Sequence, residues 1–185
     1  MRVYRASDGS ENLRGENGTR SYRASMSTPL GEVHMESDGE SLTGLRFDCP
    51  ASGLEVERGM FEETRAWLEK WFAGEMPDFT PRIRLEGTEF QKEVWEILLK
   101  IPYGETVSYK RVAEEVARRR GLPPKRMSAQ AVGGAVGRNP IAIIVPCHRV
   151  IGSDGSLTGY RGGLWRKRWM LEHECRNYTQ KLRLE

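Results

Sequence analysis

The sequence lacks a long apolar run and contains few cysteines. None of its apolar stretches approaches the roughly 20 residues that span a bilayer, and residues 1–22 are polar, without the apolar core of a secretory signal. We therefore expect neither a membrane segment nor export. The sequence has three cysteines, Cys49, Cys147 and Cys175. They are few and odd in number, which argues against a disulfide framework. They predict a reducing, cytoplasmic compartment in which a thiol can react.

Internal repeats are also absent, so the 185 residues are expected to form one domain of usual size or two small ones. With 38% hydrophobic and 30% charged residues, the composition is that of an ordinary globular protein. The charge is uneven: residues 1–87 carry 11 Lys and Arg against 16 Asp and Glu, whereas residues 88–185 carry 18 against 10. The basic second half predicts contact with a polyanion such as nucleic acid, with a solvated basic surface as the alternative.

The first half has the pattern of a small α/β domain. Residues 23–50 contain alternating apolar and polar positions around a Pro-Leu-Gly turn, which predicts strands. Apolar residues then recur at helical spacing over residues 61–72, and Gly74 is a natural stop for that helix. We therefore predict an α/β domain over residues 23–87, preceded by a flexible arm at residues 1–22.

The second half is mostly helical in pattern. Thr88 and Gln91 form a capping-box signature, and Ser108 and Ser128 are placed to cap two further helices. The second and third of these helices are short and joined by a Gly-containing segment, so they are a candidate helix-turn-helix. The pattern alone is weak evidence, because many helical bundles share it.

The third helix, residues 129–137, is rich in alanine and glycine. An interior glycine costs a helix roughly 1 kcal/mol relative to alanine, so its use here indicates a close approach to another group. That group is either a neighbouring helix or a nucleic-acid groove. Lys125, Arg126 and Arg138 flank the helix and favour the groove, where they can meet phosphates.

Residues 141–145 form a continuous apolar run that leads to Pro146. We predict a buried strand or extended segment that stops at the proline and presents Cys147 at a surface or cleft. His148 follows directly and can help to ionise the thiol. Adjacent side chains of an extended chain point to opposite faces, so we expect His148 to act through a water or a bend.

Three interpretations of Cys147 remain open at this point. It is a nucleophile if a base activates it, with Glu172 or Glu174 as the acid that orients the imidazole. It is a small buried hydrophobe if no base does. By count, the Cys-His pair together with His173 and Cys175 also matches a tetrahedral zinc set, although neither pair has the usual spacing of zinc ligands.

The segment Pro146-Cys147-His148-Arg149-Val150 resembles the active-site signature of the O6-alkylguanine-DNA alkyltransferases. The resemblance covers residues 88–174 closely and residues 23–87 more loosely. Its further motifs are, in order, Gly104-Glu105-Thr106-Val107-Ser108-Tyr109, Ala131-Val132-Gly133-Gly134-Ala135, Asn139-Pro140, Thr158-Gly159-Tyr160-Arg161-Gly162-Gly163 and Leu171-Glu172-His173-Glu174.

The resemblance implies a mixed α/β (α+β) fold. A ribonuclease-H-like α/β domain at residues 23–87 would precede a mostly helical, winged helix-turn-helix-like domain at residues 88–174 and a tail at residues 175–185. The implied function is DNA repair by direct reversal, in which a methyl or alkyl group moves irreversibly from O6 of guanine to Cys147, once per molecule. The enzyme class would be a methylated-DNA–[protein]-cysteine S-methyltransferase. The alternative is a non-enzymatic helix-turn-helix protein that binds alkylated DNA; relatives of that type lack the cysteine.

The resemblance also implies roles for individual residues. Cys147 would be the nucleophile, His148 its base through a water, and Glu174 the group that orients the imidazole. Asn139 would brace the site by hydrogen bonding, and Tyr109 would stabilise the leaving guanine. The implied pocket residues are Val150, Tyr160 and Gly162, and the implied DNA-binding residues are Ser128, Ala129, Gln130, Gly133, Arg138, Lys125 and Arg126.

The implied partner is double-stranded DNA that bears O6-alkylguanine, approached from the minor groove with little dependence on sequence. We expect a monomer, and leave open cooperative assembly on DNA and activity on O4-alkylthymine. Two features depart from the family pattern. Gln130 replaces an arginine that in some members fills the gap left by the flipped base, and residues 118–126 form a longer basic segment. No cofactor is expected, and no N-terminal zinc site, since only His34 and Cys49 are available in that half.

Overall fold

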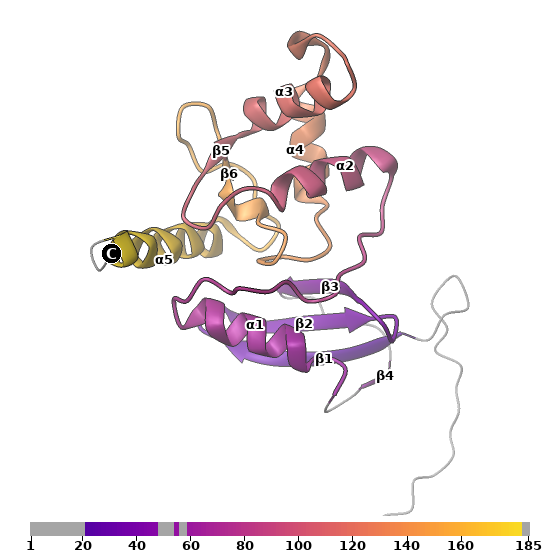
Figure 1. The fold of residues 1–185 in the computed structure, drawn as a ribbon, viewed down its shortest axis with the longest axis vertical. Coiled ribbons are helices and arrows are strands. Elements are labelled where there is room, and N and C mark those ends of the chain that lie inside the picture. Colours follow the sequence, from indigo (N-terminus) through magenta and orange to yellow (C-terminus); the bar gives the residue numbers. More distant parts are fainter. Residues whose placement is uncertain (1–20, 48–53, 56–58, 183–185) are drawn as a thin grey trace, which may run out of the picture.

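The computed structural model describes residues 21–47, 54–55 and 59–182. The predicted arm lies outside these residues except for Ser21 and Tyr22, and Cys49 also lies outside them. The first half of the chain forms a four-stranded sheet in the order β3-β2-β1-β4, with helix α1 beside it (Figure 1). The bounds are Tyr22–Thr28 (β1), Gly31–Ser37 (β2), Leu42–Phe47 (β3), Leu54–Glu55 (β4) and Glu62–Phe72 (α1).

Strands β1 and β2 form a tight hairpin whose turn follows from local chemistry. Thr28 Oγ1 accepts a hydrogen bond from the Leu30 N–H at 3.1 Å and donates one to the Gly31 carbonyl at 2.6 Å. Gly31 has a φ of +97°, which favours glycine. The pairs β1–β2 and β2–β3 are antiparallel, whereas β4 lies parallel to β1. The sheet therefore presents β3 as one edge, and this edge faces the second half of the chain (Figure 1).

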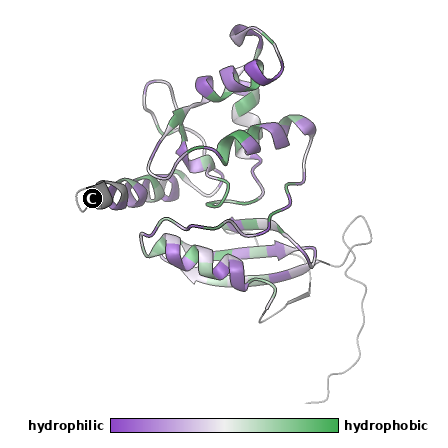
Figure 2. Ribbon diagram, in the orientation of Figure 1, coloured by the Kyte–Doolittle hydropathy of each residue, from purple (hydrophilic) through white to green (hydrophobic). Residues whose placement is uncertain are grey.

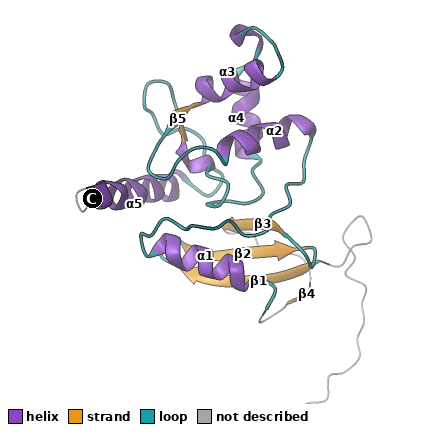
Figure 3. Cartoon of the chain, viewed as in Figure 1, coloured by secondary structure: helices purple, strands orange, loops and turns teal. Residues whose placement is uncertain are grey.

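The second half is mostly helical (Figure 3). Thr88 and Gln91 complete the predicted capping box, and the hydroxyls of Ser108 and Ser128 accept hydrogen bonds from backbone N–H groups two or three residues further on. The bounds, with η for a 3₁₀ helix, are Glu89–Leu98 (α2), Val107–Ser108 (β5), Tyr109–Arg119 (α3), Pro124–Arg126 (η1), Ala129–Gly137 (α4), Cys147–Arg149 (η2), Val150–Ile151 (β6) and Leu164–Leu182 (α5).

Helix α5 is longer than the sequence pattern predicts. The resemblance implies that the C-terminal domain ends at Glu174 and that a tail follows, but α5 continues to Leu182 and so takes in most of the expected tail at residues 175–185. The residues after Glu174 are mostly polar, so the apolar stripe that marks the earlier turns does not extend to them. Polar contacts along the helix are present instead: Asn177 Nδ2 donates to the His173 carbonyl at 2.8 Å.

One hydrophobic core extends through both halves of the chain. Figure 2 shows hydrophobic residues on α2 and in the turn of residues 141–145, which lies over the sheet. The backbone also joins the two halves, because the Leu45 N–H of β3 donates to the Pro140 carbonyl at 2.9 Å and the Ala142 N–H donates to the Leu45 carbonyl at 2.8 Å. The domain boundary between residues 87 and 88 stays a prediction.

The prediction of a strand over residues 141–145 is wrong. These residues form a buried turn whose first residue makes an isolated β-bridge, and Ile143 has a φ of +67°. The side chain of Asn139 explains the turn. Its oxygen accepts from the Ile141 N–H at 3.0 Å, and its Nδ2 donates to the Val145 carbonyl at 2.8 Å. One amide thus satisfies backbone groups that a strand would pair with a neighbour.

Helices α3 and α4, with η1 between them, pack against each other and against α2. This is the arrangement expected of a helix-turn-helix. The predicted α/β (α+β) class, with a small N-terminal sheet and a mostly helical C-terminal part, is confirmed. Among the described residues, no helix is long and apolar enough to cross a membrane.

Candidate active site

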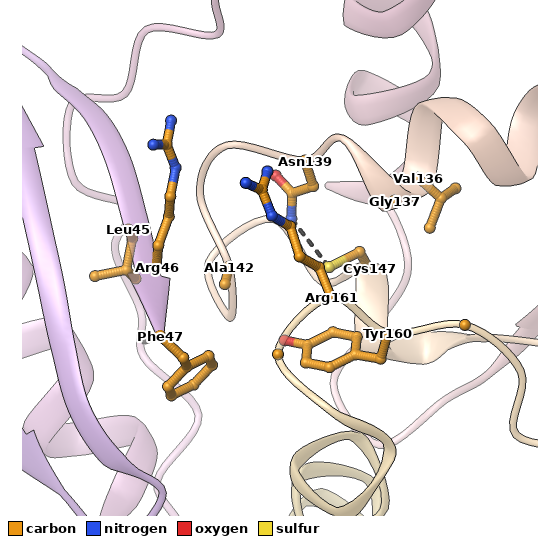
Figure 4. A pocket seen from close by; sticks show the side chains of 12 residues that line it. Leu45, Arg46, Phe47, Val136, Gly137, Asn139, Ala142, Cys147, Tyr160 and Arg161 are labelled. Atoms are coloured by element: carbon orange, nitrogen blue, oxygen red, sulfur yellow. Dashed lines mark hydrogen bonds between the residues drawn. The ribbon is translucent and has the colours of Figure 1, made fainter. Parts of the chain in front are cut away.

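Cys147 begins η2, directly after the buried turn, and is 7% exposed. Its Sγ accepts a hydrogen bond from Asn139 Nδ2 at 3.1 Å (Figure 4). Its backbone N–H donates to the Val145 carbonyl at 2.8 Å. The amide that closes the turn therefore also holds the sulfur. Cys147 lines a cavity, so the thiol is mostly covered by its neighbours yet borders a space that protein atoms do not fill.

This cavity lies between β3 and the loop that precedes α5 (Figure 4). The cavity and the open solvent at its mouth together make up about 560 Å³ that protein atoms do not fill. Of the predicted pocket residues, Tyr160 and Gly162 line it, whereas Val150 is fully buried and does not. The lining residues are Leu45, Arg46, Phe47, Val136, Gly137, Asn139, Ala142, Cys147, Gly159, Tyr160, Arg161 and Gly162.

Tyr160 and Gly162 narrow the cavity together. A Cβ at position 162 would lie 2.9 Å from Tyr160 Cε1 and 3.0 Å from Phe47 Cδ2, so glycine is needed where the loop passes between the two rings. Burial, with a further contribution from the charge of the Cys147 thiolate, raises the pKa of Tyr160 well above its ordinary value. The Tyr160 phenol therefore stays neutral.

Burial raises the pKa of Cys147, against the opposing effects of the hydrogen bond from Asn139 and the positive charge of Lys167. The resting group is thus a neutral thiol. The thiolate is the nucleophile, so its formation requires a base close to the sulfur.

His148 is the base nearest in sequence, and it is fully buried. Its Nε2 lies 3.0 Å from Oε1 of Glu174. A carboxylate accepts hydrogen bonds, so we assign the proton to Nε2 and a lone pair to Nδ1. Nδ1 makes no hydrogen bond with any described residue. The proton path from Cys147 to this atom through a water stays a prediction.

Glu174, not Glu172, orients the imidazole. Glu174 is buried on α5, whereas Glu172 is exposed. Besides His148, Oε1 of Glu174 accepts from Arg149 Nη2 at 2.7 Å and from Trp71 Nε1 at 3.1 Å. Its Oε2 accepts from Arg149 Nε at 2.8 Å and from the Gly104 N–H at 3.3 Å. Sequence reasoning missed these three donors, although the position of Arg149 beside the Cys-His pair was a signal for one of them.

The charges of this network favour a neutral imidazole beside an ionised carboxylate. Burial lowers the pKa of His148, although Glu174 raises it. Burial alone would raise the pKa of Glu174, but the charges and hydrogen bonds of His148 and Arg149 outweigh it and hold this pKa far below its usual range. His148 is therefore available as a base, and Glu174 can stabilise the imidazolium that forms when it takes a proton.

Tyr109 begins α3, and its hydroxyl donates to the Thr158 carbonyl at 3.2 Å. Burial raises its pKa, so it too is a neutral phenol. Its ring lies 5.7 Å from Nζ of Lys167, which is fully buried and donates to the carbonyls of Thr158 at 2.8 Å and Val150 at 2.7 Å. The sequence pattern does not single out Lys167. The structure instead makes it a buried tie between α5 and the loop beside the thiol.

Helix α4 is exposed at its start, where Ser128 caps it and Ala129 and Gln130 follow. Contacts among the described residues do not require its glycines. A Cβ on Gly133 would lie 3.8 Å from the Tyr109 ring, an ordinary contact, and one on Gly137 would meet nothing within 4 Å. A neighbouring helix therefore does not explain Gly133 and Gly137, which fits the groove interpretation, whereas the buried Ala135 packs against α2.

The long basic segment divides into two parts. Arg118, Arg119 and Arg120 form ion pairs of 2.7 to 3.5 Å with carboxylates of α2 and α3. Lys125 and Arg126 are exposed and form no ion pair with a described residue. Of the five basic residues of this segment, these two remain available to phosphates.

The zinc interpretation finds no support in the described part of the chain. There, no group of three or more His, Cys, Asp or Glu side chains is placed to hold a metal ion. His173 Nε2 lies 2.7 Å from the Trp71 carbonyl, and His148 is bound to Glu174.

Comparisons with known proteins agree with this site. A family model for the DNA-binding domain of 6-O-methylguanine DNA methyltransferase matches residues 89–176. The methylated-DNA–protein-cysteine methyltransferase of Mycobacterium leprae is 48% identical over 155 residues, which are 81% of this chain and 90% of that protein. The enzyme of the same name from Methanosarcina acetivorans is 44% identical over 160 residues, 83% of this chain and 97% of that protein.

Solved structures agree as well. The crystal structure of Mycobacterium tuberculosis O6-methylguanine methyltransferase matches with a TM-score of 0.73 at 42% identity, over 85% of this chain and 94% of that one. That of OGT from the same organism in complex with DNA matches with a TM-score of 0.74 at 42% identity, over 84% of this chain and 94% of that one.

A helix-turn-helix pair beside a buried thiol, with a His–Glu pair behind it, defines a DNA-binding protein that carries a nucleophilic cysteine. The comparisons make this class specific. The chain belongs to the family of the methylated-DNA–protein-cysteine methyltransferases. The family and the enzyme class predicted from the sequence are confirmed.

Proposed function

We propose that this protein repairs DNA by direct reversal, moving a methyl or other alkyl group from O6 of guanine to Sγ of Cys147. The observation that carries the proposal is the position of that sulfur, which lines a cavity next to the buried His148–Glu174 pair. The product is a thioether, and no described residue near it offers a chemical route back to a thiol. Each molecule therefore acts once.

The reaction consists of one displacement with two proton movements. Nδ1 of His148 takes the thiol proton through a water, and Glu174 stabilises the imidazolium. The sulfur then attacks the alkyl carbon, the S–C bond forms, and the C–O6 bond breaks with its electron pair left on the guanine. The Tyr109 hydroxyl, which donates to the Thr158 carbonyl in the free protein, turns to the leaving guanine and gives it its proton, and solvent returns a proton to the phenolate. Asn139 keeps the sulfur in place throughout.

The DNA contacts are expected to be independent of sequence. Ser128, which caps α4, and Ala129, Gln130 and Gly133 of α4 approach the minor groove. The small side chains of Ser128, Ala129 and Gly133 permit close contact there. The alkylated base must leave the stack to reach a thiol that is 7% exposed. Lys125, Arg126 and Arg138 bind phosphates, because none of the three pairs with a carboxylate of a described residue.

We propose that the protein acts as a monomer, in a reducing cytoplasmic compartment. A thiol acceptor has to stay reduced until it meets its substrate, which favours such a compartment. Gln130 occupies the space left by the extruded base, with a side chain that fills volume and hydrogen bonds but carries no charge.

Mass spectrometry of the intact protein and of its peptides tests the proposal. Incubation with a duplex that contains O6-methylguanine should add one methyl group per molecule, on Cys147, and restore guanine. Cys147→Ser should bind the duplex and accept no methyl group, whereas Cys175→Ser should behave as the wild type. Transfer to the Cys147→Ser variant at the wild-type rate would overturn the proposal. An unchanged base after long incubation with excess wild-type protein would identify a non-enzymatic binding protein.

A further inference from the structure

The carboxylate of Glu174 receives a hydrogen bond from the N-terminal half of the chain. Its other donors, His148, Arg149 and the backbone of Gly104, all lie after residue 88. Trp71 is the exception: it lies on α1, and its indole Nε1 donates to Oε1 at 3.1 Å. This oxygen is the same one that accepts from the imidazole.

Trp71 is held firmly in this position. It is fully buried, and its backbone carbonyl lies 2.7 Å from Nε2 of His173, so α1 is attached to α5 at both the side chain and the backbone. The rings of Trp71 and His148 meet edge to face, with centroids 6.1 Å apart and planes at 75°. The indole therefore touches both members of the His–Glu pair, and it limits the rotation of the imidazole as well as the position of the carboxylate.

We propose that Trp71 is a positioning residue for alkyl transfer, so that the N-terminal half of the chain sets the orientation and basicity of His148 through Glu174. This inference rests on the proposed function, because it assigns Trp71 to the base that activates Cys147. The indole does not touch the reacting atoms.

The hydrogen bond from Trp71 weakens Oε1 as a proton acceptor. Donors to a buried carboxylate stabilise its charged form, so removal of this donor leaves a carboxylate that attracts the imidazole proton more strongly. The charged or titratable groups around His148 are Glu174 and Lys167 of α5 and Arg149 of η2, together with the Cys147 thiol beside it. Of these, Glu174 favours the imidazolium, while Arg149 and Lys167 oppose it. Loss of the indole donor shifts this balance toward the imidazolium, which cannot act as a base.

The test is the pH dependence of single-turnover methyl transfer by the full chain, with protein in saturating excess over an O6-methylguanine duplex. Trp71→Phe keeps an aromatic ring and removes the donor. We expect its maximal rate at neutral pH to fall about tenfold, the change that corresponds to one hydrogen bond to a charged group. We also expect the acid limb of the rate profile to move to higher pH, with the half-saturating protein concentration unchanged.

Trp67→Phe is the matched control. Trp67 lies one turn earlier on the same helix and is also buried, and among the described residues its indole makes no hydrogen bond to Glu174. Its variant should lose stability without a shift of the acid limb. The active fraction of each variant is measured separately with the duplex in excess, and the protein concentrations are corrected by it, so unfolded protein does not count.

A second variant covers the case in which Trp71→Phe does not fold. Replacement of Trp71 by β-(3-benzothienyl)alanine puts a sulfur where the indole has its N–H and keeps the bicyclic ring. The same shift of the acid limb is expected. The inference would be overturned if the acid limbs of the wild type, the Trp67 variant and this analogue coincided. A wild type that transfers no methyl group would instead refute the proposed function.

Discussion

Two regions of this protein, both proposed to act on alkylated DNA, differ in burial and in the partners of their polar groups. The buried network behind the thiol, formed by Trp71, His148, Arg149 and Glu174, is closed to solvent and supplied with hydrogen-bond partners. The surface of α4 and η1 is exposed, and Lys125 and Arg126 on it have no ion-pair partner among the described residues.

The difference follows from what each region is proposed to do. A base that must be oriented within fractions of an ångström needs partners inside the fold, because these are fixed before the substrate arrives. Cations that bind the phosphates of any DNA sequence need no fixed partner and lose affinity if one is present. The buried network should therefore control rate and stability, and the α4 surface should control affinity.

The largest effect is expected from Glu174→Gln. The amide keeps the shape of the side chain but leaves the buried Arg149 without its counter-charge. We expect the free energy of unfolding to fall by about 3–5 kcal/mol, and the rate of transfer at saturating protein to fall by at least about a hundredfold. Urea unfolding and single-turnover kinetics measure the two effects.

Glu172→Gln is the control for this change, since Glu172 is an exposed residue of the same helix. Its free energy of unfolding should stay within about 0.5 kcal/mol of the wild type. Equal effects at the two positions would remove the distinction between the buried network and its exposed surroundings.

The next largest effect is expected from acid, which should lower the free energy of unfolding by protonating the buried network. Burial lowers the pKa of His148 in the folded state below its ordinary 6.5, so the neutral form is favoured there. The unfolded chain then binds the proton more readily, and stability that is complete above pH 6.5 is lost as the pH falls below it. The lowered pKa of Glu174 has the same sign and acts at lower pH, below its ordinary 4.5.

Urea unfolding at several pH values between 7 and 5 measures this loss. A variant without the titrating imidazole, His148→Gln, should show a flatter dependence over that interval. A wild type whose stability rises as the pH falls from 7 to 5 would contradict the direction assigned to His148.

A smaller effect is expected on the α4 surface. The double variant Lys125→Ala/Arg126→Ala should bind duplex DNA more weakly and reduce the slope of log affinity against log salt by about 1.8, or about 0.9 for each phosphate contact. Its maximal transfer rate should not change. Arg118→Ala/Arg120→Ala is the matched control, because both of these arginines already pair with carboxylates. Equal salt slopes for the two double variants would show that ion pairing does not decide which cations bind DNA.

The smallest effect is expected from Gly133→Ala. The added methyl group would lie 3.8 Å from the Tyr109 ring, so the fold has room for it. The helix should gain up to about 1 kcal/mol of stability, while affinity for duplex DNA falls because the groove loses its close approach. Thermal unfolding measures the change in stability, and DNA titration measures the change in affinity, which should have the opposite sign. A gain in both stability and affinity would mean that α4 does not enter a groove.

The elements and the site differ in how far the sequence predicted them. Helix starts at Thr88, Ser108 and Ser128 were predictable because a cap is a local interaction within three residues. The run 141–145 was assigned wrongly because short apolar segments look alike in strands and turns, and the deciding contact is the side chain of Asn139.

The site was predicted only as far as its motif extends. Cys147, His148 and Glu174 followed from the family pattern, and Glu174 was preferred to Glu172 on that ground. The donor from Trp71 is 103 residues from its acceptor in the chain, and Lys167 looked like any exposed lysine. Contacts of this kind depend on how helices pack, so no local pattern in the sequence carries them.

The order of these residues along the chain has a consequence for biosynthesis. Cys147 and His148 are translated before α5, the helix that carries Lys167 and Glu174. A nascent chain that has been made only as far as η2 holds the thiol and the imidazole, but it has neither the carboxylate that orients the base nor the helix that covers it. Until α5 docks, Cys147 and His148 lack the carboxylate and the cover that the proposed transfer requires, so alkyl transfer should begin only after this last helix has folded.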